Sequence, residues 1–249
     1  MKSAALIILI AFTSCAVPVS YVNNIPRSSG LEEKGDVLLN ANVGSDARAR
    51  DKNFQLGMAW SPVQHFGLAI EYSGHLRLDD MSHDELYFYS GSLIYYRPLS
   101  NGATIEFLLS AGEGQVNGDI SFVNHSLFNA ETFEIDARYR TRSFQANYNL
   151  DSKNEDTKLS FGFRVRNTQF SKYSYIRTLD NTVTDRSYQK DDLSIYVLDP
   201  FIESNQKLIG KLFFNSRVSY SFLDGPIRNG FRHPFYKRLG VSCGLQLKL

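Results

Sequence analysis

Phe54-Gln55-Leu56-Gly57-Met58-Ala59-Trp60-Ser61 alternates large apolar side chains with small or polar ones. Successive side chains of a β-strand point to opposite faces, so this stretch predicts a strand with one strongly apolar face. The other face carries Gln, Gly, Ala and Ser, whereas a soluble sheet shows water charged and β-branched residues. Gly and Ala weaken a strand, but they fit where space is scarce, as it is inside a narrow closed barrel. The pattern therefore favours a barrel whose apolar face meets lipid and whose small residues line the lumen.

The same alternation recurs between turns along most of the chain. Ten candidate strands result, near residues 36–43, 54–61, 66–73, 86–97, 103–112, 143–150, 158–166, 193–203, 211–222 and 239–249. The facing of 86–97 is ambiguous because both parities carry aromatic rings, and the parity of 193–203 is expected to switch at a bulge beside Asp199-Pro200. We predict an all-β fold, an antiparallel up-and-down transmembrane β-barrel of about ten strands, within a range of about eight to twelve.

The connections between the candidate strands alternate in length. Those at 62–65, 98–102, 151–156 and 204–207 are short, whereas the others are longer and more charged, including 113–141 and 167–192. Transmembrane barrels have short periplasmic turns and longer extracellular loops, and an even number of strands returns the chain to its starting side. Both termini are therefore expected on the short-turn, periplasmic side of the outer membrane of a Gram-negative bacterium.

The first residues have the pattern of an export signal. A positive charge precedes a short apolar stretch at 4–12, which is a signal-peptide core rather than a spanning helix, and Cys15 follows. A Cys directly after Thr and Ser is similar to the lipobox of bacterial lipoproteins, whose Cys is acylated, although the usual Leu three positions earlier is Phe12 here. An ordinary signal-peptidase cut beside Ser14 or Ala16 is the alternative. We predict a signal peptide with a lipobox-like end at 1–15, a flexible tether at 16–34 and an outer-membrane barrel at 35–249.

Composition argues against several classes of function. The 249 residues carry a formal net charge of +1, which implies no general attraction to nucleic acid. The mean hydropathy is negative, and no later apolar run is long enough for a transmembrane helix. With only two cysteines, Cys15 and Cys243, a Cys/His zinc cluster is excluded, and lipidation of Cys15 would leave no intrachain disulfide. Cys243 is expected to be a small lipid-facing residue, and we expect no cofactor and no metal.

Four features together are similar to a known family. They are the lipobox-like start, Leu31-Glu32-Glu33-Lys34-Gly35-Asp36 before the first strand, the hairpin at 59–68, and Leu198-Asp199-Pro200-Phe201 late in the chain. The chain resembles small outer-membrane β-barrel lipoproteins of Gram-negative bacteria, most closely those of the Bacteroidota. The resemblance implies a transmembrane barrel in the outer membrane and little about function. The chain departs from the pattern at Phe12 and at its last residue, Leu249, where many barrels have an aromatic side chain that the assembly machinery reads.

One long loop is the best candidate for chemistry. Asp79, Asp80 and His83 lie in the loop at 74–85, and acidic and His side chains near the rim of a ten-stranded barrel resemble omptin-type surface proteases, which activate a water. The alternatives are a solvated polar loop or casual binding of a divalent cation by clustered carboxylates. Because no other long loop supplies an Asp-x-His pair, we assign no catalytic residue, and a rim protease stays a third hypothesis.

Charged residues on the inward parity form a second candidate site. They are Glu71, Glu106, Arg164, Arg166, Lys211, Arg217 and Lys248. They could line an anion-selective channel, or they could form a packed network in which Glu71 and Glu106 pair with arginines such as Arg164 and Arg217. Unpaired charge in a narrow lumen is costly, and a ten-stranded barrel is close to the size that side chains fill unaided, so we favour the network.

These patterns lead to a functional expectation. We expect a structural or surface-interaction role for a monomeric barrel, with a narrow pore or small-solute channel as the alternative. The expected partners are outer-membrane lipid, lipopolysaccharide and the barrel-assembly machinery. Arg138, Arg140 and Arg142 could meet lipopolysaccharide phosphates, because Arg pairs bidentately with phosphate, although a solvated strand extension is the commoner explanation.

Overall fold

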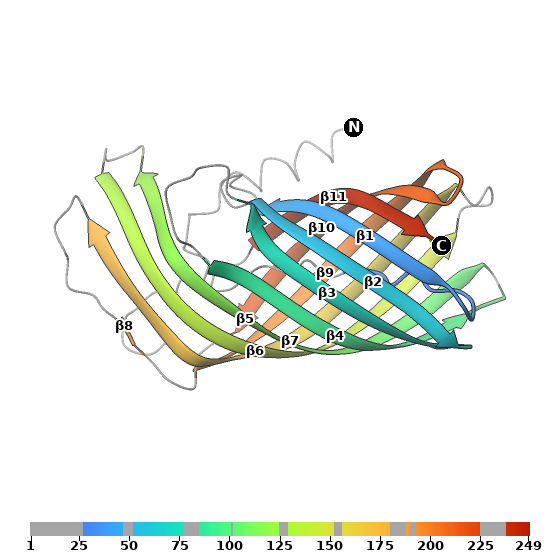
Figure 1. Ribbon diagram of the computed structural model, residues 1–249, viewed down its shortest axis with the longest axis horizontal. Helices are drawn as coiled ribbons and strands as arrows, with labels where there is room; N and C mark the ends of the chain where they lie inside the picture. The colour runs from blue at the N-terminus through green and yellow to red at the C-terminus, as the bar shows by residue number, and fades with distance from the viewer. Residues whose placement is uncertain are drawn as a thin grey trace.

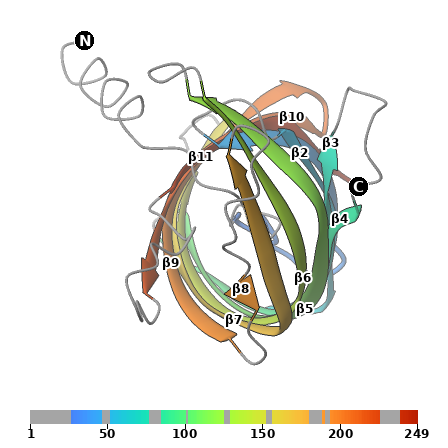
Figure 2. The ribbon, with the colours of Figure 1, turned by 90° about the vertical axis from the view of Figure 1, so that its left-hand side faces the viewer.

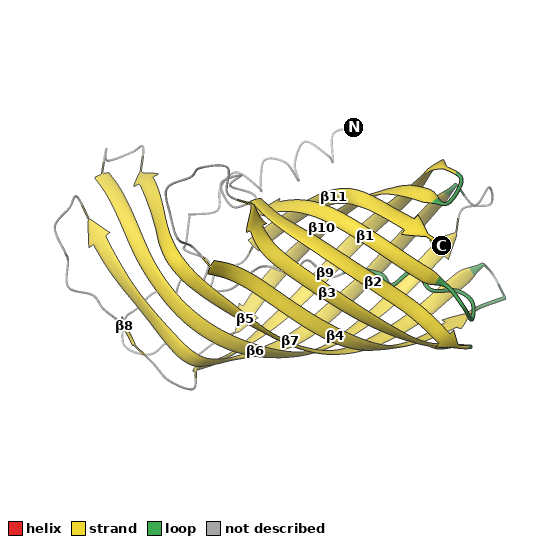
Figure 3. Cartoon of the chain, in the orientation of Figure 1, coloured by secondary structure: helices red, strands yellow, loops and turns green. Residues whose placement is uncertain are grey.

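Strands make up almost all of the described chain. The structure is a computed structural model, and it describes residues 27–46, 52–76, 85–100, 102–124, 129–151, 156–179, 188–189, 193–224 and 238–249. Figure 3 shows strands joined by turns and loops. No helix in these ranges is long and apolar enough to cross a membrane.

Ten of the strands close into one antiparallel barrel. The strands are β1 (Val37–Asp46), β2 (Lys52–Val63), β3 (Phe66–Leu76), β4 (Glu85–Pro98), β5 (Ala103–Asn124), β6 (Asn129–Asp151), β7 (Thr157–Leu179), β8 (Tyr188–Gln189), β9 (Leu193–Ile209), β10 (Leu212–Asp224) and β11 (Arg238–Lys248). Each barrel strand pairs with the next along the chain, β7 pairs with β9, and β11 closes the barrel against β1 (Figures 1 and 2). The two-residue β8 pairs only with β7 and lies outside this circuit. The predicted up-and-down barrel of ten strands is confirmed.

The two faces of each strand have opposite chemistry, as the alternation in the sequence predicts. Large apolar side chains on the outer face are exposed, for example Met58, Trp60 and Ile70 on β2 and β3, whereas Gln55, Ser61 and Ser73 on the inner face of these strands are buried. The structure also resolves the facing of β4, because Leu93 is exposed and Ile94 is buried. The opposed parities therefore make an apolar outer wall and a mostly polar inner wall.

The bulge expected in β9 is absent, so that prediction was wrong. Side chains from Leu193 to Asn205 alternate between buried and less buried without interruption, and the register with β7 continues unshifted through the pair Phe163 and Pro200. On the other side, the pairs with β10 omit Pro200 and resume in the same register. The missing N–H of proline costs pairing locally and does not change the parity of the strand.

Three strands are much longer than the others. β5, β6 and β7 have 22, 23 and 23 residues, whereas β1 to β4 have 10 to 14, and the extra length projects beyond the barrel at the end where the long loops lie (Figure 1). The charged stretch at 113–141 was predicted to be a loop, but the pairing of β5 with β6 is continuous from Ala103 to Asn124. The charges that suggested a loop lie on paired strands, for example Glu113 opposite Arg140. We call this end the long-loop end and the other the short-turn end.

Candidate functional site in the barrel lumen

The described residues that precede β1 reach into the barrel. We call residues 27–34 the N-terminal segment; sequence analysis assigned them to the flexible tether. Next to it, at the short-turn end, the backbone N–H of Gly35 donates to the carbonyl of Ser61 at 2.7 Å. Leu31 is fully buried and packs with Leu38 and Ile94. At the far end of the segment, the carbonyl of Arg27 accepts a hydrogen bond of 2.6 Å from Gln145 on the inner wall of β6. The segment is therefore part of the core of the barrel.

The carboxylate of Glu106 binds residues 28–30 of this segment. Glu106 of β5 is fully buried, and Ser28, Ser29 and Gly30 together give it four hydrogen bonds of 2.9 to 3.1 Å, from two hydroxyls and two backbone N–H groups. Asn147 of β6 donates a fifth, of 3.0 Å. An ionised carboxylate only accepts hydrogen bonds, so a ring of donors of this kind offsets its removal from water. The N-terminal segment thus supplies most of the partners that Glu106 needs.

Small residues of the inner wall make room for the segment. A Cβ added to Gly57 would lie 2.3 Å from the guanidinium of Arg27, and one added to Gly67 would lie 2.3 Å from the side chain of Leu31. Gly30, within the segment, has a φ of +69°, a backbone conformation that residues other than glycine rarely adopt. Gly57 and Gly67, which the alternation places on the inner face, therefore leave space for the side chains of the N-terminal segment.

A network of buried ion pairs surrounds the segment. Asp199 of β9 accepts hydrogen bonds of 2.9 and 3.1 Å from Arg164, lies 3.6 Å from Arg166, and accepts one of 2.5 Å from the hydroxyl of Ser221. All four residues are buried. A buried charge is tolerated when it is paired and hydrogen-bonded, and this cluster joins β7, β9 and β10 through one carboxylate.

The second carboxylate of β9, Glu203, joins the wall to the segment. It lies 3.3 Å from Arg217 of β10 and accepts a hydrogen bond of 2.9 Å from the backbone N–H of Ser28. Arg27 in turn lies 3.4 Å from Glu71 of β3, with both side chains mostly buried. The segment thus contributes both a charge and a donor to the lumen network.

The expected charges are present, but most have other partners than predicted. Glu71 pairs with Arg27, Glu106 binds the N-terminal segment, and Arg164 and Arg217 pair with Asp199 and Glu203. Lys211 is outside the network, because it lies in the turn between β9 and β10 with an exposed side chain. Sequence reasoning missed Asp199 and Glu203 because a parity switch was assumed at Pro200. Without that assumption, both share the inward parity of Leu193.

A second charge cluster lies at the short-turn end. Glu32 pairs with Lys158 of β7 and with Lys248 of β11, the latter at 3.2 Å, and Lys248 also lies 3.2 Å from Asp36. The backbone N–H groups of Glu32 and Glu33 donate to Asp36 at 2.9 and 3.0 Å. Partial burial acts to raise the pKa of Asp36, but these two N–H groups and the ammonium of Lys248 outweigh it and hold the pKa below its usual value. This cluster fixes the chain where it leaves the lumen and begins β1.

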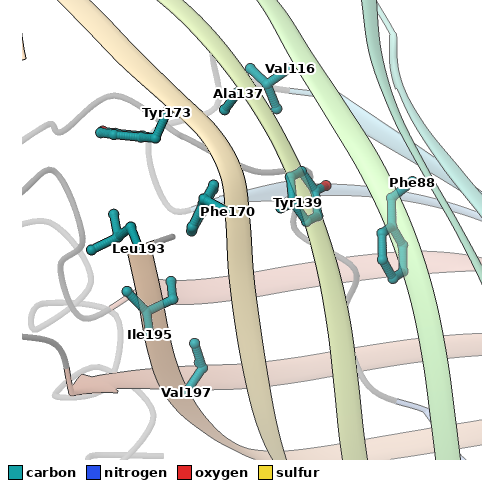
Figure 4. Packing of buried hydrophobic residues seen from close by; sticks show 9 residues of the cluster. All are labelled: Phe88, Val116, Ala137, Tyr139, Phe170, Tyr173, Leu193, Ile195 and Val197. Atoms are coloured by element: carbon teal, nitrogen blue, oxygen red, sulfur yellow. The ribbon is translucent and has the colours of Figure 1, made fainter. Parts of the chain in front are cut away.

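Two apolar clusters also lie among the buried residues. The short-turn cluster consists of Leu31, Leu38, Ala59, Ile94, Tyr96 and Leu108. The long-loop cluster, shown in Figure 4, consists of Phe88, Val116, Ala137, Tyr139, Phe170, Tyr173, Leu193, Ile195 and Val197. A cavity of about 40 Å³ beside Arg27 and Arg164 and one of about 30 Å³ beside Glu106 remain in the lumen. Each is large enough for a few water molecules at most.

Other predicted sites are outside the described residues. These sites are Cys15 and the loop residues Asp79, Asp80 and His83. In the ranges that the structure does describe, no group of three or more His, Cys, Asp or Glu side chains could hold a metal ion. Cys243 is a free cysteine whose side chain is exposed on the outer wall. In the described ranges, the buried charged side chains gather in the lumen, which is the candidate polar site.

Comparisons with known proteins found similar folds among solved structures only. No protein-family model and no curated protein matches the sequence. Among solved structures, the KdgM porin has a TM-score of 0.42 at 10% identity, covering 85% of this chain and 99% of the porin. The N-terminal β-barrel domain of Pseudomonas aeruginosa OprF has a TM-score of 0.35 at 9% identity, covering 88% and 100%. The translocator domain of the autotransporter NalP from Neisseria meningitidis has a TM-score of 0.43 at 11% identity, covering 88% and 90%. These values are too low to carry a functional conclusion.

Proposed function

We propose that the chain is an outer-membrane β-barrel of a Gram-negative bacterium with a structural or surface-interaction role and a lumen closed by its own N-terminal segment. The observation that carries the proposal is the inversion of chemistry across the wall. Leu56, Leu68 and Leu245 are 45 to 47% exposed on the outer face, whereas Arg217 and Glu203 are 2% exposed on the inner face. An apolar surface that encircles the barrel would be unstable in water, and it suits a bilayer.

The surface-interaction role is supported by the extension of β5, β6 and β7. A strand of about 9 to 11 residues suffices to cross a bilayer, so the 22 residues of β5 reach about twice as far as crossing needs. The extension keeps its own apolar contacts, since Val116, Ala137 and Tyr139 are buried in the long-loop cluster. A paired, packed sheet that projects past the barrel is an ordered surface for contact with another molecule.

The N-terminal end is part of the same proposal. Lipidation of Cys15 and a periplasmic N-terminus are proposed from the lipobox-like start and the even number of barrel strands, whereas the described segment runs from Arg27 inside the lumen to Gly35 at the short-turn end. Palmitate labelling of the protein in cells, lost in Cys15→Ser, is the result expected for lipidation. Labelling that persists in Cys15→Ser, or none in the wild type, would contradict it.

A narrow pore is the second candidate function. The observation in its favour is that the N-terminal segment is held by hydrogen bonds and ion pairs rather than by a covalent bond, so that its withdrawal would expose Glu71, Glu106 and Glu203 to the lumen. The two candidates differ in the conductance of the unmodified protein.

Planar bilayers separate the closed barrel from the pore. The wild type is expected to insert without stable conductance. Glu106→Gln removes the charge that holds residues 28–30, and this variant is expected to show channel openings. Glu113→Gln is the matched control, because Glu113 lies on the outer face of β5 beside Arg140 and Tyr89. Steady conductance of the wild type would contradict the closed lumen. Silence of Glu106→Gln, with the barrel folded, would contradict the pore.

A further inference from the structure

Two neighbouring rows of residues on the outer wall, each running across six strands, differ in composition: the first is uniformly large and apolar, and the second is mixed. The apolar row, in register from β3 to β9, is Leu68, Leu93, Leu109, Phe144, Val165 and Leu198. The next row toward the long-loop end is Ile70, Gly91, Ala111, Arg142, Asn167 and Tyr196. Aromatic and charged side chains above an apolar band are typical of the membrane interface. Arg142 thus lies at the edge of the apolar band on the long-loop side.

A hollow lies in the wall at this boundary. Its volume is about 830 Å³, and its lining includes Ile70, Gly91, Leu93, Ala111, Arg142 and Tyr196. Gly91 and Ala111 leave their large neighbours uncovered, since Ile70, Leu93 and Leu109 are 59 to 65% exposed, well above Leu68 at 45%. The hollow is shallow and open to the outside, a shape that suits a lipid lying against the wall better than an enclosed small molecule. The hollow combines an apolar floor with a guanidinium at its upper edge.

The charges above the hollow leave two arginines for a ligand. Arg138, Arg140 and Arg142 are all exposed on the outer face of β6. Arg140 pairs with Glu113 at 3.5 Å, and the nearby Lys172 pairs with Asp136. Among the described residues, no carboxylate forms an ion pair with Arg138 or with Arg142. These two arginines are four positions apart on one face, about 13 Å along the strand.

We propose that this hollow and its arginines bind one molecule of lipid A, the phosphorylated glycolipid of lipopolysaccharide, with an acyl chain over Gly91 and Ala111 and phosphates at Arg142 and Arg138. The proposal rests on the outer-membrane location proposed above, which gives the long-loop end contact with the outer leaflet. Arg binds phosphate bidentately, so each guanidinium can hold one phosphate group. Two separated arginines suit a headgroup that carries two phosphates on different sugars better than the single phosphate of a phospholipid.

Native mass spectrometry of the full-length protein in detergent, titrated with bis-phosphorylated lipid A, tests the proposal. Arg142→Gln is expected to lower the affinity about tenfold, the usual size of a lost charge-assisted hydrogen bond. Gly91→Leu is expected to lower it by a similar factor by filling the hollow. The leucine should fold normally, because a Cβ at Gly91 would meet only a carbonyl oxygen at 4.0 Å. Arg97→Gln is the matched control, since Arg97 is exposed near the short-turn end of β4 and should not affect binding.

Each other outcome overturns the proposal. Unchanged affinity in both variants would show that lipid A does not use the hollow, and an equal loss in Arg97→Gln would show only a general attraction to anionic lipid. Phosphatidylglycerol that binds as tightly as lipid A would exclude the two-phosphate assignment. A protein that stays soluble without detergent would instead contradict the membrane barrel itself, so failure of the proposed function is distinguishable from failure of this site.

Discussion

The outer and inner faces of the same ten strands place different demands on the sequence. On the outer wall any large apolar side chain serves, and neighbours such as Leu68, Leu93 and Leu109 have no specific partner to satisfy. On the inner wall each charged group depends on named partners, as Asp199 does on Arg164 and Ser221. The wall is therefore specified by a class of residue, whereas the lumen is specified by individual pairings.

The largest effect is expected inside the lumen. Asp199→Ala leaves Arg164 and Arg166 buried without their shared carboxylate, and breaking a buried pair in this way costs about 3 to 5 kcal/mol of the free energy of unfolding. Urea unfolding of the reconstituted barrel, followed by the fluorescence of Trp60, which is the single tryptophan, measures the loss. Asp136→Ala is the control, because its pair with Lys172 is exposed and is worth about 1 kcal/mol or less. Equal losses in the two variants would contradict the dependence of the lumen on specific pairs.

A smaller effect is expected on the outer wall. Leu93→Arg places a charge where the side chain is 62% exposed to the proposed acyl chains, and such a charge costs about 2 to 4 kcal/mol near the bilayer midplane and less toward its edges. Leu93→Phe keeps the apolar character and should be nearly neutral in the same unfolding assay. If Leu93→Arg is as stable as the wild type, the outer face does not meet lipid.

The smallest effect is expected at the short-turn end and depends on pH. The pKa of Asp36 in the folded protein is held below its unfolded value of about 3.9. Its ionised form therefore adds stability above that value, and this stability disappears as the pH falls through the lower, folded pKa. Asp36→Asn should remove this contribution, of about 1 kcal/mol at most, and flatten the acid limb of the stability curve. Urea midpoints between pH 7 and pH 3 measure it, and an acid limb unchanged in Asp36→Asn would contradict the assignment.

The predictability of the fold follows the same division. Alternation alone placed all ten barrel strands, because the outer wall needs only a period of two. It placed the ends of β5, β6 and β7 badly, because the outer parity of these strands turns polar toward the long-loop end, and Glu113 or Arg140 then looks like part of a loop. It also misjudged Pro200, since a lost pairing hydrogen bond does not force a change of face.

The lumen was predictable only in outline. The inward parity named Glu71, Glu106, Arg164, Arg166 and Arg217 correctly as lumen residues. It could not name their partners, because which strands meet across the lumen depends on the closure and tilt of the barrel. The role of residues 27–34 was hidden for another reason: a segment without regular alternation has no period from which burial can be inferred. The sequence showed that Gly57 and Gly67 are on the inner face, but it did not show that residues 27–34 fill the space beside them.

The position of the N-terminal segment also sets an order of events during assembly. Ser28 binds Glu106, 78 positions later, and Glu203, 175 positions later, so its site is complete only when β9 is in place. Contacts so distant in sequence form late, since their loops must close first. β1, which follows the segment directly, also pairs with β11, the last of the described strands. The burial of the N-terminal segment and the closure of the barrel therefore belong to the same final step. A chain that lacks β9 to β11 offers neither the complete site for the segment nor a partner for the free edge of β1.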